Sequence, residues 1–307
     1  MGKYAIAIDL GATHLRVAVI DATGILREKS VGSTSGKPSN QIIEDIAACV
    51  SELKSRWGIE HLAGIGIGVT GFLVLNQGLL ILSPNLPGFE NFPILSKLES
   101  ALGTQVLLEN DANAAALGER WVGAGVGLDD LVLISIGTGL GAGIIINGEI
   151  LHGFAGLAGE VGHMTLYPDD SLCTCGNVGC LENYASGRAI ATIAKLTDLG
   201  DLTSKDVLKL AKAGNERAQS VFSTMGKSLG IGIASLVNIF NSPLYLLSGG
   251  PVSAWDFFAP AMFEEISKRS LVFRTTNTVV KKAQLGEDSC LYGAAYLVFK
   301  TQPKLNV

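Results

Sequence analysis

Charged residues are scarce in this sequence. Of its 307 residues only 17% are Asp, Glu, Lys or Arg, and the formal net charge is −5. Because nucleic-acid binding needs clustered Lys and Arg to neutralise phosphates, this acidic balance argues against nucleic acid as a partner. Hydrophobic residues make up 48% of the chain, which excludes a disordered protein.

Targeting and membrane-spanning segments are also missing. The N-terminus lacks the charged, apolar and cleavage regions of a signal peptide, and Ile6 stands where a myristoylation signal needs Ser or Thr. No apolar run reaches the roughly 18 uninterrupted residues of a membrane span. Only five cysteines occur, and three of them lie within eight residues, which suits a metal site better than a disulfide framework. We therefore expect a cytoplasmic protein with no membrane partner.

Glycine, in contrast, is abundant. The chain contains 38 glycines, against about 21 at the average usage of roughly 7%. They follow no Gly-X-Y period, which excludes collagen and low-complexity linkers. The surplus therefore predicts turns, or places where the backbone comes close to a ligand.

The spacing of apolar residues predicts a mixed α/β chain. Strands are expected at 4–9, 15–21, 63–69, 106–108, 131–136, 141–147 and 244–247, and helices at 40–56, 112–122, over most of 186–240 and at 289–300. Two hairpins share one design, in which a small-residue turn containing Thr joins two strands. No Ser/Pro-rich linker separates the halves, so a boundary near 112–130 would be an internal hinge.

The turns of these hairpins are candidate phosphate-binding sites. A carboxylate at a strand end can hold a divalent cation through water, Gly lets the backbone approach phosphate, and Thr supplies a hydroxyl donor. An ordinary hairpin turn favours the same residues, so either turn alone is ambiguous. The pair indicates a polyphosphate clamp, and a third turn after a later strand suits ribose and base. The expected positions are Asp9, Gly11, Thr13, Gly137, Thr138, Gly139, Gly249 and Gly250. Neither a Rossmann fingerprint nor a Walker P-loop is present.

A cysteine cluster carries the most specific signal. Cys173, Cys175 and Cys180 follow His163 closely in the sequence. Three thiolates and one imidazole complete a tetrahedral zinc shell with no open position, so zinc here would be structural. Free buried thiols, or a disulfide between Cys175 and Cys180, are the alternatives. Cys49 and Cys290 are interpreted as inert core residues.

Carboxylates flank this cluster and a second motif. Glu160 and Glu182 would present acceptors to hydroxyl groups of a polar ligand, although a solvated acidic loop explains them as well. Asn110 and Asp111 stand at a strand-to-helix junction, where they serve either as helix caps or, for Asp111, as a general base. The remaining histidines, at 14, 61 and 152, show no partner spacing and are interpreted as ordinary.

Together these residues resemble the ROK family of sugar kinases and sugar-responsive regulators, within the actin/hexokinase superfamily. The resemblance covers essentially the whole chain. Its most specific element runs from Glu160-Val-Gly-His163 to Cys173-x-Cys175-Gly-x-x-Gly-Cys180-x-Glu182. It implies an α/β fold of two ribonuclease-H-like domains with the active site in the cleft between them. Residues 1–112 would form the N-terminal domain, on which a helix at about 290–307 packs back, and residues 113–289 would form a larger domain with the zinc loop.

The resemblance also implies an activity. It predicts ATP-dependent phosphorylation of a hexose at its 6-hydroxyl, with glucose the leading substrate, Asp111 the catalytic base, and Mg²⁺ held near Asp9 at the phosphates. Sugar hydroxyls would be bound by Asn85, Asn110, Asp111, Glu160, His163 and Glu182. His163 would use one ring nitrogen for zinc and the other for the sugar. Relatives commonly form dimers, so a homodimer is expected.

Two positions depart from the family pattern, and the substrate within the family stays open. Ala12 replaces a second Gly, and Phe89 replaces a Trp often found at the rim of the sugar pocket. N-acetylmannosamine, N-acetylglucosamine, fructose or mannose could be the substrate in place of glucose. A non-catalytic sugar-sensing regulator is disfavoured, because the phosphate hairpin begins at residue 4 and leaves no room for a DNA-binding domain before it.

Overall fold

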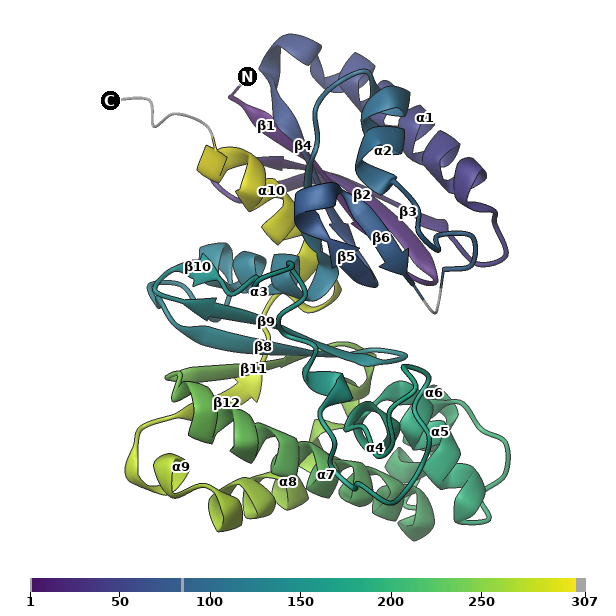
Figure 1. Ribbon diagram of the computed structural model, residues 1–307, viewed down its shortest axis with the longest axis vertical. Helices are drawn as coiled ribbons and strands as arrows, with labels where there is room; N and C mark the ends of the chain where they lie inside the picture. Colours follow the sequence, from purple (N-terminus) through teal and green to yellow (C-terminus); the bar gives the residue numbers. More distant parts are fainter. Residues whose placement is uncertain (1, 84–85, 302–307) are drawn as a thin grey trace. The chain divides into compact units, whose positions relative to one another are not determined.

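The computed structural model describes residues 2–83 and 86–301 and divides into two compact units (Figure 1). Unit 1 extends to Asp129 and includes Gly143–Ala158 and the segment that begins at Gln284. Unit 2 consists of Asp130–Ala142 and Gly159–Ala283. The boundary expected at residue 112 falls at the start of helix α3 (Asp111–Val122), and this helix lies in unit 1.

Unit 1 is built on a five-stranded sheet of order β3-β2-β1-β4-β7. Its strands are β1 (Tyr4–Leu10), β2 (His14–Asp21), β3 (Leu26–Ser33), β4 (Leu62–Val69) and β7 (Leu107–Asn110). Strand β1 pairs antiparallel with β2, which confirms the first predicted hairpin, and parallel with β4. Because β4 also runs parallel to β7, the carboxyl ends of β1, β4 and β7 meet at one edge of the sheet.

Alternation along β1 directs its side chains into two cores. Ile6 and Ile8 pack with helices α1 (Ser39–Trp57) and α2 (Ile94–Leu102) on one face. The small residues Ala5 and Ala7 pack against α10 (Ser289–Thr301) on the other. This helix lies so close to β4 that a Cβ on Gly66 would come within 1.9 Å of the Ala294 carbonyl oxygen.

A second five-stranded sheet has the order β10-β9-β8-β11-β12. Its strands are β8 (Leu131–Ile136), β9 (Leu140–Ile146), β10 (Glu149–Ile150), β11 (Leu244–Ser248) and β12 (Val279–Lys282). The second predicted hairpin is present as the neighbours β8 and β9. Strand β11 runs parallel to both β8 and β12.

Helices make up most of the rest of unit 2. They are α4 (Glu182–Ala185), α5 (Gly187–Leu196), α6 (Ser204–Lys212), α7 (Glu216–Phe240), α8 (Trp255–Arg269) and α9 (Leu271–Thr275). Helix α7 is long and apolar enough to cross a membrane by composition alone. However, 67% of its apolar window is buried within the protein, as expected of a core helix.

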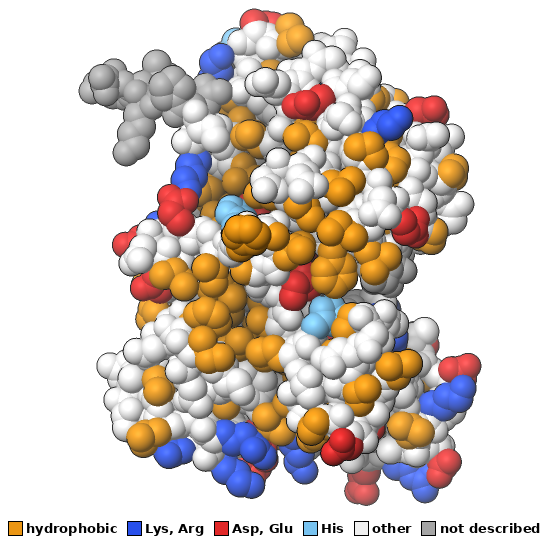
Figure 2. Space-filling model, viewed as in Figure 1, with side chains coloured by type: hydrophobic (Ala, Val, Ile, Leu, Met, Phe, Trp, Pro, Cys, Tyr) orange, Lys and Arg blue, Asp and Glu red, His pale blue; other side chains and the backbone are white. Residues whose placement is uncertain are grey.

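Several elements were not predicted from the sequence. They include β3 and α2, the small antiparallel sheet of β5 (Phe72–Val74) and β6 (Leu79–Leu82), and the elements β10, β12, α8 and α9. Short 3₁₀ turns occur at Ile59–His61, Leu75–Gln77, Val161–His163, Gly250–Ala254 and Gly286–Asp288. Figure 2 shows uncharged and apolar side chains over most of the viewed face, with Lys and Arg in small groups, consistent with the low charged content.

Candidate active site and metal centre

The first glycine-rich turn joins β1 to β2 in unit 1. The Gly11 backbone N donates to the carbonyl oxygen of His14 at 3.0 Å. Thr34, a buried residue just after β3, makes two hydrogen bonds to this turn. Its hydroxyl donates to the Gly11 carbonyl at 2.9 Å, and its backbone N–H donates to the Thr13 carbonyl at 3.1 Å. The turn is therefore preformed, with Thr13 exposed at its tip.

Asp9, the last polar residue of β1, is buried beside this turn. Its Oδ2 accepts a hydrogen bond from Arg16 Nη1 at 2.9 Å, and the second guanidinium nitrogen reaches Glu287 Oε2 at 2.9 Å. Burial raises the pKa of Asp9, and the nearby Arg16 charge opposes this rise. The thiol of Cys290, from α10, also hydrogen-bonds to Asp9.

Asp111 begins helix α3, directly after β7. The parallel register aligns Asp9 with Gly68 and Gly68 with Glu109, so both aspartates lie at the same edge of the sheet. The Ala112 N–H donates to Asp111 Oδ1 at 2.9 Å. Burial, followed by the negative charge of Asp9, raises the pKa of Asp111 to about 6, while a hydrogen bond from Thr70 opposes the rise. A carboxylate with this pKa is suited to general-base chemistry near neutral pH.

The capping role predicted for the Asn110–Asp111 junction belongs to Asn110. Asn110 is the N-cap of α3, since its Oδ1 accepts from the N–H groups of Ala112 at 2.9 Å and Asn113 at 3.2 Å. Its amide nitrogen lies 3.4 Å from the Gly71 carbonyl oxygen. Asn110 therefore caps the helix, and Asp111 is the neighbour whose carboxyl pKa is raised. Asn85, the other expected amide ligand, lies outside the described residues.

The second glycine-rich turn, Gly137-Thr138-Gly139, lies in unit 2 between β8 and β9. The Leu140 N–H that follows it donates to Glu182 Oε2 at 2.8 Å. The same oxygen leaves no room for a side chain at Gly139, where a Cβ would approach to 2.2 Å. Gly249-Gly250 follows β11, the parallel neighbour of β8, so both turns lie at one edge of the second sheet.

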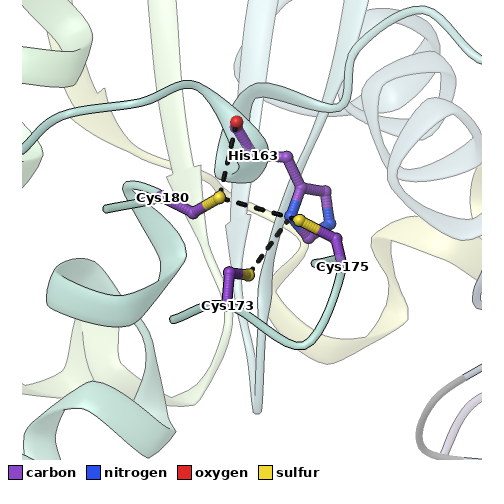
Figure 3. A group of neighbouring side chains, drawn as sticks. All are labelled: His163, Cys173, Cys175 and Cys180. Atoms are coloured by element: carbon purple, nitrogen blue, oxygen red, sulfur yellow. Dashed lines mark hydrogen bonds between the residues drawn. The ribbon is translucent and has the colours of Figure 1, made fainter. Parts of the chain in front are cut away.

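The predicted metal ligands come together in unit 2 (Figure 3). The ligand atoms of His163, Cys173, Cys175 and Cys180 all lie within 4.8 Å of one another. Cys173 Sγ is 3.7 Å from His163 Nδ1, and Cys175 Sγ is 3.7 Å from Cys180 Sγ. These separations match the edges of a tetrahedron with zinc–sulfur bonds of about 2.3 Å.

The cysteine alternatives fit less well. The 3.7 Å sulfur separation is far longer than the disulfide bond that was considered for Cys175 and Cys180. Burial, followed by the neighbouring thiols, raises the pKa of Cys180 to about 12, so that without a cation it remains a neutral thiol. A divalent cation is the group that offsets such crowding, and the donor set is the one that zinc prefers.

The acidic residues flanking the cluster occupy different surroundings. Glu160 Oε2 lies 3.9 Å from His163 Nε2, the ring nitrogen remote from Cys173. Glu182 is buried, and its Oε1 accepts from Arg188 Nη2 at 3.3 Å while its other oxygen holds Leu140. The end of the cysteine-containing segment and the second glycine-rich turn are therefore linked within unit 2 through this carboxylate.

Several residues near the site were not identified from the sequence. His152 was interpreted as ordinary, but its Nε2 lies 2.7 Å from Glu109 Oε2, next to the Asn110–Asp111 junction. Cys290 is buried, as predicted, yet it contacts Asp9. Phe89 is also fully buried and packs on Phe92 with ring centroids 4.8 Å apart, so it belongs to the core of unit 1.

This chain is similar to known proteins over almost its whole length. The model of the ROK family matches residues 5–301. A putative xylose repressor from Caldicellulosiruptor sp. (strain Rt8B.4) is 34% identical over 95% of this chain and 77% of its own length. A glucokinase from Halalkalibacterium halodurans is 34% identical over 96% of this chain and 95% of its own.

A solved structure is also similar to this chain over almost its whole length. The ROK family glucokinase from Streptomyces griseus, in complex with glucose and AMPPNP, is 30% identical with a TM-score of 0.85, over 97% of this chain and 99% of that one. The likeness confirms the predicted α/β fold, which is the two-domain actin-like ATPase fold.

Proposed function

Because this chain belongs to the ROK family, we propose that it is a sugar kinase that transfers the γ-phosphoryl group of ATP to the 6-hydroxyl of a hexose, with glucose as the leading substrate. The glucokinases among its relatives, one of them crystallised with glucose and AMPPNP, support this choice. The observation that carries the proposal is the carboxyl group of Asp111, whose pKa is raised to about 6 beside the buried Asp9.

Asp111 is proposed as the general base. It would accept the proton of the sugar hydroxyl as the hydroxyl oxygen attacks the γ-phosphorus in line and the bond from phosphorus to the β–γ bridging oxygen breaks. A pKa near 6 leaves the carboxylate ionised at neutral pH and still basic enough to take the proton. Such a base is worth about 10²–10⁴-fold in rate.

The two glycine-rich turns are proposed to bind the phosphates of ATP, and Gly249 and Gly250 to bind the adenosine. Their exposed backbone and the Thr13 and Thr138 hydroxyls offer donors for phosphate oxygens. Asp9, as the buried carboxylate beside the first turn, would hold Mg²⁺ through water. The cation would neutralise negative charge on the transferred phosphoryl group. The protein would contribute by positioning its hydrogen-bond donors around the phosphate oxygens.

Sugar hydroxyls are proposed to contact Asn110, Glu160, His163 and Glu182. Asn110 would act through its amide nitrogen, since its oxygen caps α3. His163 would present Nε2, the nitrogen that faces Glu160, because Nδ1 is directed to the thiols. Zinc bound by the four clustered ligands would be structural, since four protein ligands leave it no open position.

A coupled ADP-release assay tests this function. The panel comprises glucose, mannose, fructose, N-acetylmannosamine, N-acetylglucosamine and xylose, each with ATP as the donor. We expect sugar-dependent ADP release, highest with glucose. A higher rate with an N-acetylhexosamine would keep the kinase activity but make that sugar the substrate in place of glucose. Binding of a sugar with no ADP release from any of them would overturn the kinase and favour a sugar-sensing protein.

A further inference from the structure

A buried carboxylate, that of Glu109, lies two residues before the proposed base in the sequence. Glu109, at the end of β7, has a side chain that is only 4% exposed. Its Oε1 accepts from the Asn110 N–H at 3.0 Å and from Asn113 Nδ2 at 2.9 Å. Its Oε2 lies 2.7 Å from His152 Nε2. Both oxygens of this carboxylate are therefore committed to named partners.

These partners lie on either side of Asp111 along the chain. Asn110 precedes it and caps α3, and Asn113 is in the first turn of that helix. Glu109 therefore holds the chain on both sides of Asp111, through the Asn110 backbone N–H and the Asn113 side-chain amide. A shift of Glu109 would disturb both hydrogen bonds together, and with them the direction of the Asp111 carboxyl group.

The amide of Asn113 is oriented with its nitrogen toward this carboxylate. Asn113 is buried, and among the described residues its Oδ1 has no hydrogen-bond partner. The reverse orientation of the amide would place an oxygen against the Glu109 carboxylate, and two acceptors cannot form a hydrogen bond. Here the amide nitrogen must face Glu109 for the carboxylate to be satisfied.

His152 completes the network from a distant part of the chain, 43 positions after Glu109. Its hydrogen bond to Glu109 raises the pKa of the imidazole above its usual value, although partial burial opposes this rise. Lys300 and Glu149 also act on His152, and they form an ion pair with each other. The protonated imidazole would place a positive charge beside the buried carboxylate, and the contact with Glu109 favours this form.

We propose that His152 and Glu109 are positioning residues for catalysis, holding the β7–α3 junction so that the Asp111 carboxylate keeps its catalytic orientation. This inference rests on the proposed sugar-kinase function. Neither residue is assigned contact with sugar or nucleotide. Their role is to set the geometry of the base and to balance a negative charge two residues from it.

The test uses a matched set of variants in the full-length protein with ATP and the best sugar of the panel. His152→Phe removes the hydrogen bond but keeps a planar ring, whereas His152→Gln restores a donor without the charge. Glu109→Gln keeps one acceptor oxygen, replaces the other with an amide donor, and removes the negative charge. For each variant, kcat, both KM values, the pH dependence of kcat and the Tm are measured.

We expect His152→Phe to lower kcat at least tenfold with the KM for ATP changed less than twofold. In the pH profile of this variant, the acid limb, where kcat falls as the pH is lowered, should move to higher pH. The reason is that a Glu109 charge without its imidazole partner would raise the pKa of Asp111 further. His152→Gln should recover most of kcat, and Glu109→Gln should move the acid limb to lower pH. The titratable groups that face Asp111 and this pair from neighbouring elements are Asp9, Cys290, Glu149 and Lys300, all unchanged in the variants.

The outcomes separate this inference from the function on which it rests. Absence of turnover in the wild-type protein overturns both. Wild-type turnover that is lost in Asp111→Asn but unaltered in His152→Phe overturns the positioning role alone. Equal loss of kcat in His152→Phe and His152→Gln, with lower Tm and an unmoved acid limb, also overturns it, because that pattern is purely structural.

Discussion

Glu182 Oε2 accepts a hydrogen bond from the Leu140 backbone N–H at 2.8 Å. Glu182 follows the last cysteine of the metal cluster by two residues, and Leu140 follows the second glycine-rich turn. The carboxylate assigned to the sugar therefore also holds a turn assigned to the phosphates of ATP. This dual role makes the effects of substitutions in the two regions interdependent.

Glu182→Ala should weaken the binding of both substrates. Leu140 is buried, so its N–H would be left unpaired, at a cost of about 1–3 kcal/mol. We expect the KM for ATP to rise on the order of tenfold, together with the KM for the sugar. Glu182→Gln keeps an acceptor for Leu140 and serves as the control. A rise confined to the sugar KM in Glu182→Ala would show that the turn does not depend on this contact.

Gly139→Ala should destabilise unit 2. The added Cβ would lie 2.2 Å from Glu182 Oε2, which forces the carboxylate or the turn to move. Overpacking of this kind costs typically about 1–3 kcal/mol. Gly137→Ala is the matched control, because its Cβ would meet no atom within 4 Å. Chemical denaturation of both variants measures the difference, and equal stability would contradict the observed packing.

Cys175→Ser should release the proposed zinc and abolish sugar binding while largely sparing nucleotide binding. The serine hydroxyl is a poor replacement for a thiolate ligand, and the loop that carries Glu182 would lose its anchor. Metal content by mass spectrometry and calorimetric titration with glucose check this result. Cys49→Ser, a half-buried thiol in α1, is the control. Full glucose affinity in rigorously metal-free protein would refute the structural role of the metal.

Glu119→Ala should strongly destabilise the protein. This carboxylate is completely buried and accepts hydrogen bonds from the backbone N–H groups of Ala124, Gln284 and Leu285 and from the Ser289 hydroxyl. Removing it leaves buried donors unpaired, at about 1–3 kcal/mol for each group. Thermal unfolding should show a large decrease in Tm, while the exposed Glu60→Ala should leave Tm nearly unchanged. Similar Tm values would contradict the burial described.

The sequence allowed the turns and the metal loop to be predicted because their residues are close together along the chain. The four metal ligands span residues 163–180, and each glycine-rich turn directly follows an apolar strand. Spacing alone therefore predicted both turns and the grouping of the four candidate metal ligands, which the structure brings together. The parallel pairing that places Asp9 and Asp111 at the same edge of the sheet could be expected only from the resemblance to the family.

The remaining features depend on contacts that spacing does not encode. His152 meets Glu109 across 43 positions. Strand β3 is mostly exposed, so it lacks the apolar alternation that marks β1 and β2. Helix α8 contains Pro260 in its interior, a residue that usually indicates a helix boundary. Each of these features is fixed by tertiary packing, which overrides the local signal.

The pH dependence of the wild-type protein should show the base directly. Since the pKa of Asp111 is raised to about 6, the base is ionised above this pH and protonated below it. The rate kcat should therefore be constant near neutral pH and fall about tenfold per unit well below pH 6, as expected for one titrating base. Stopped assays between about pH 4.5 and 8 check the limb. A flat profile down to the lower end would argue against a carboxylate base with this pKa.

The most direct test of the central claim is single-turnover phosphoryl transfer by Asp111→Asn. The amide keeps an oxygen for the Ala112 N–H, so the start of α3 should be preserved, but it cannot accept the sugar proton. We expect glucose and ATP to bind with affinities close to those of the wild-type protein, while the rate of phosphoryl transfer falls by about 10²–10⁴-fold. Transfer at nearly the wild-type rate would contradict the assignment of Asp111 as the catalytic base.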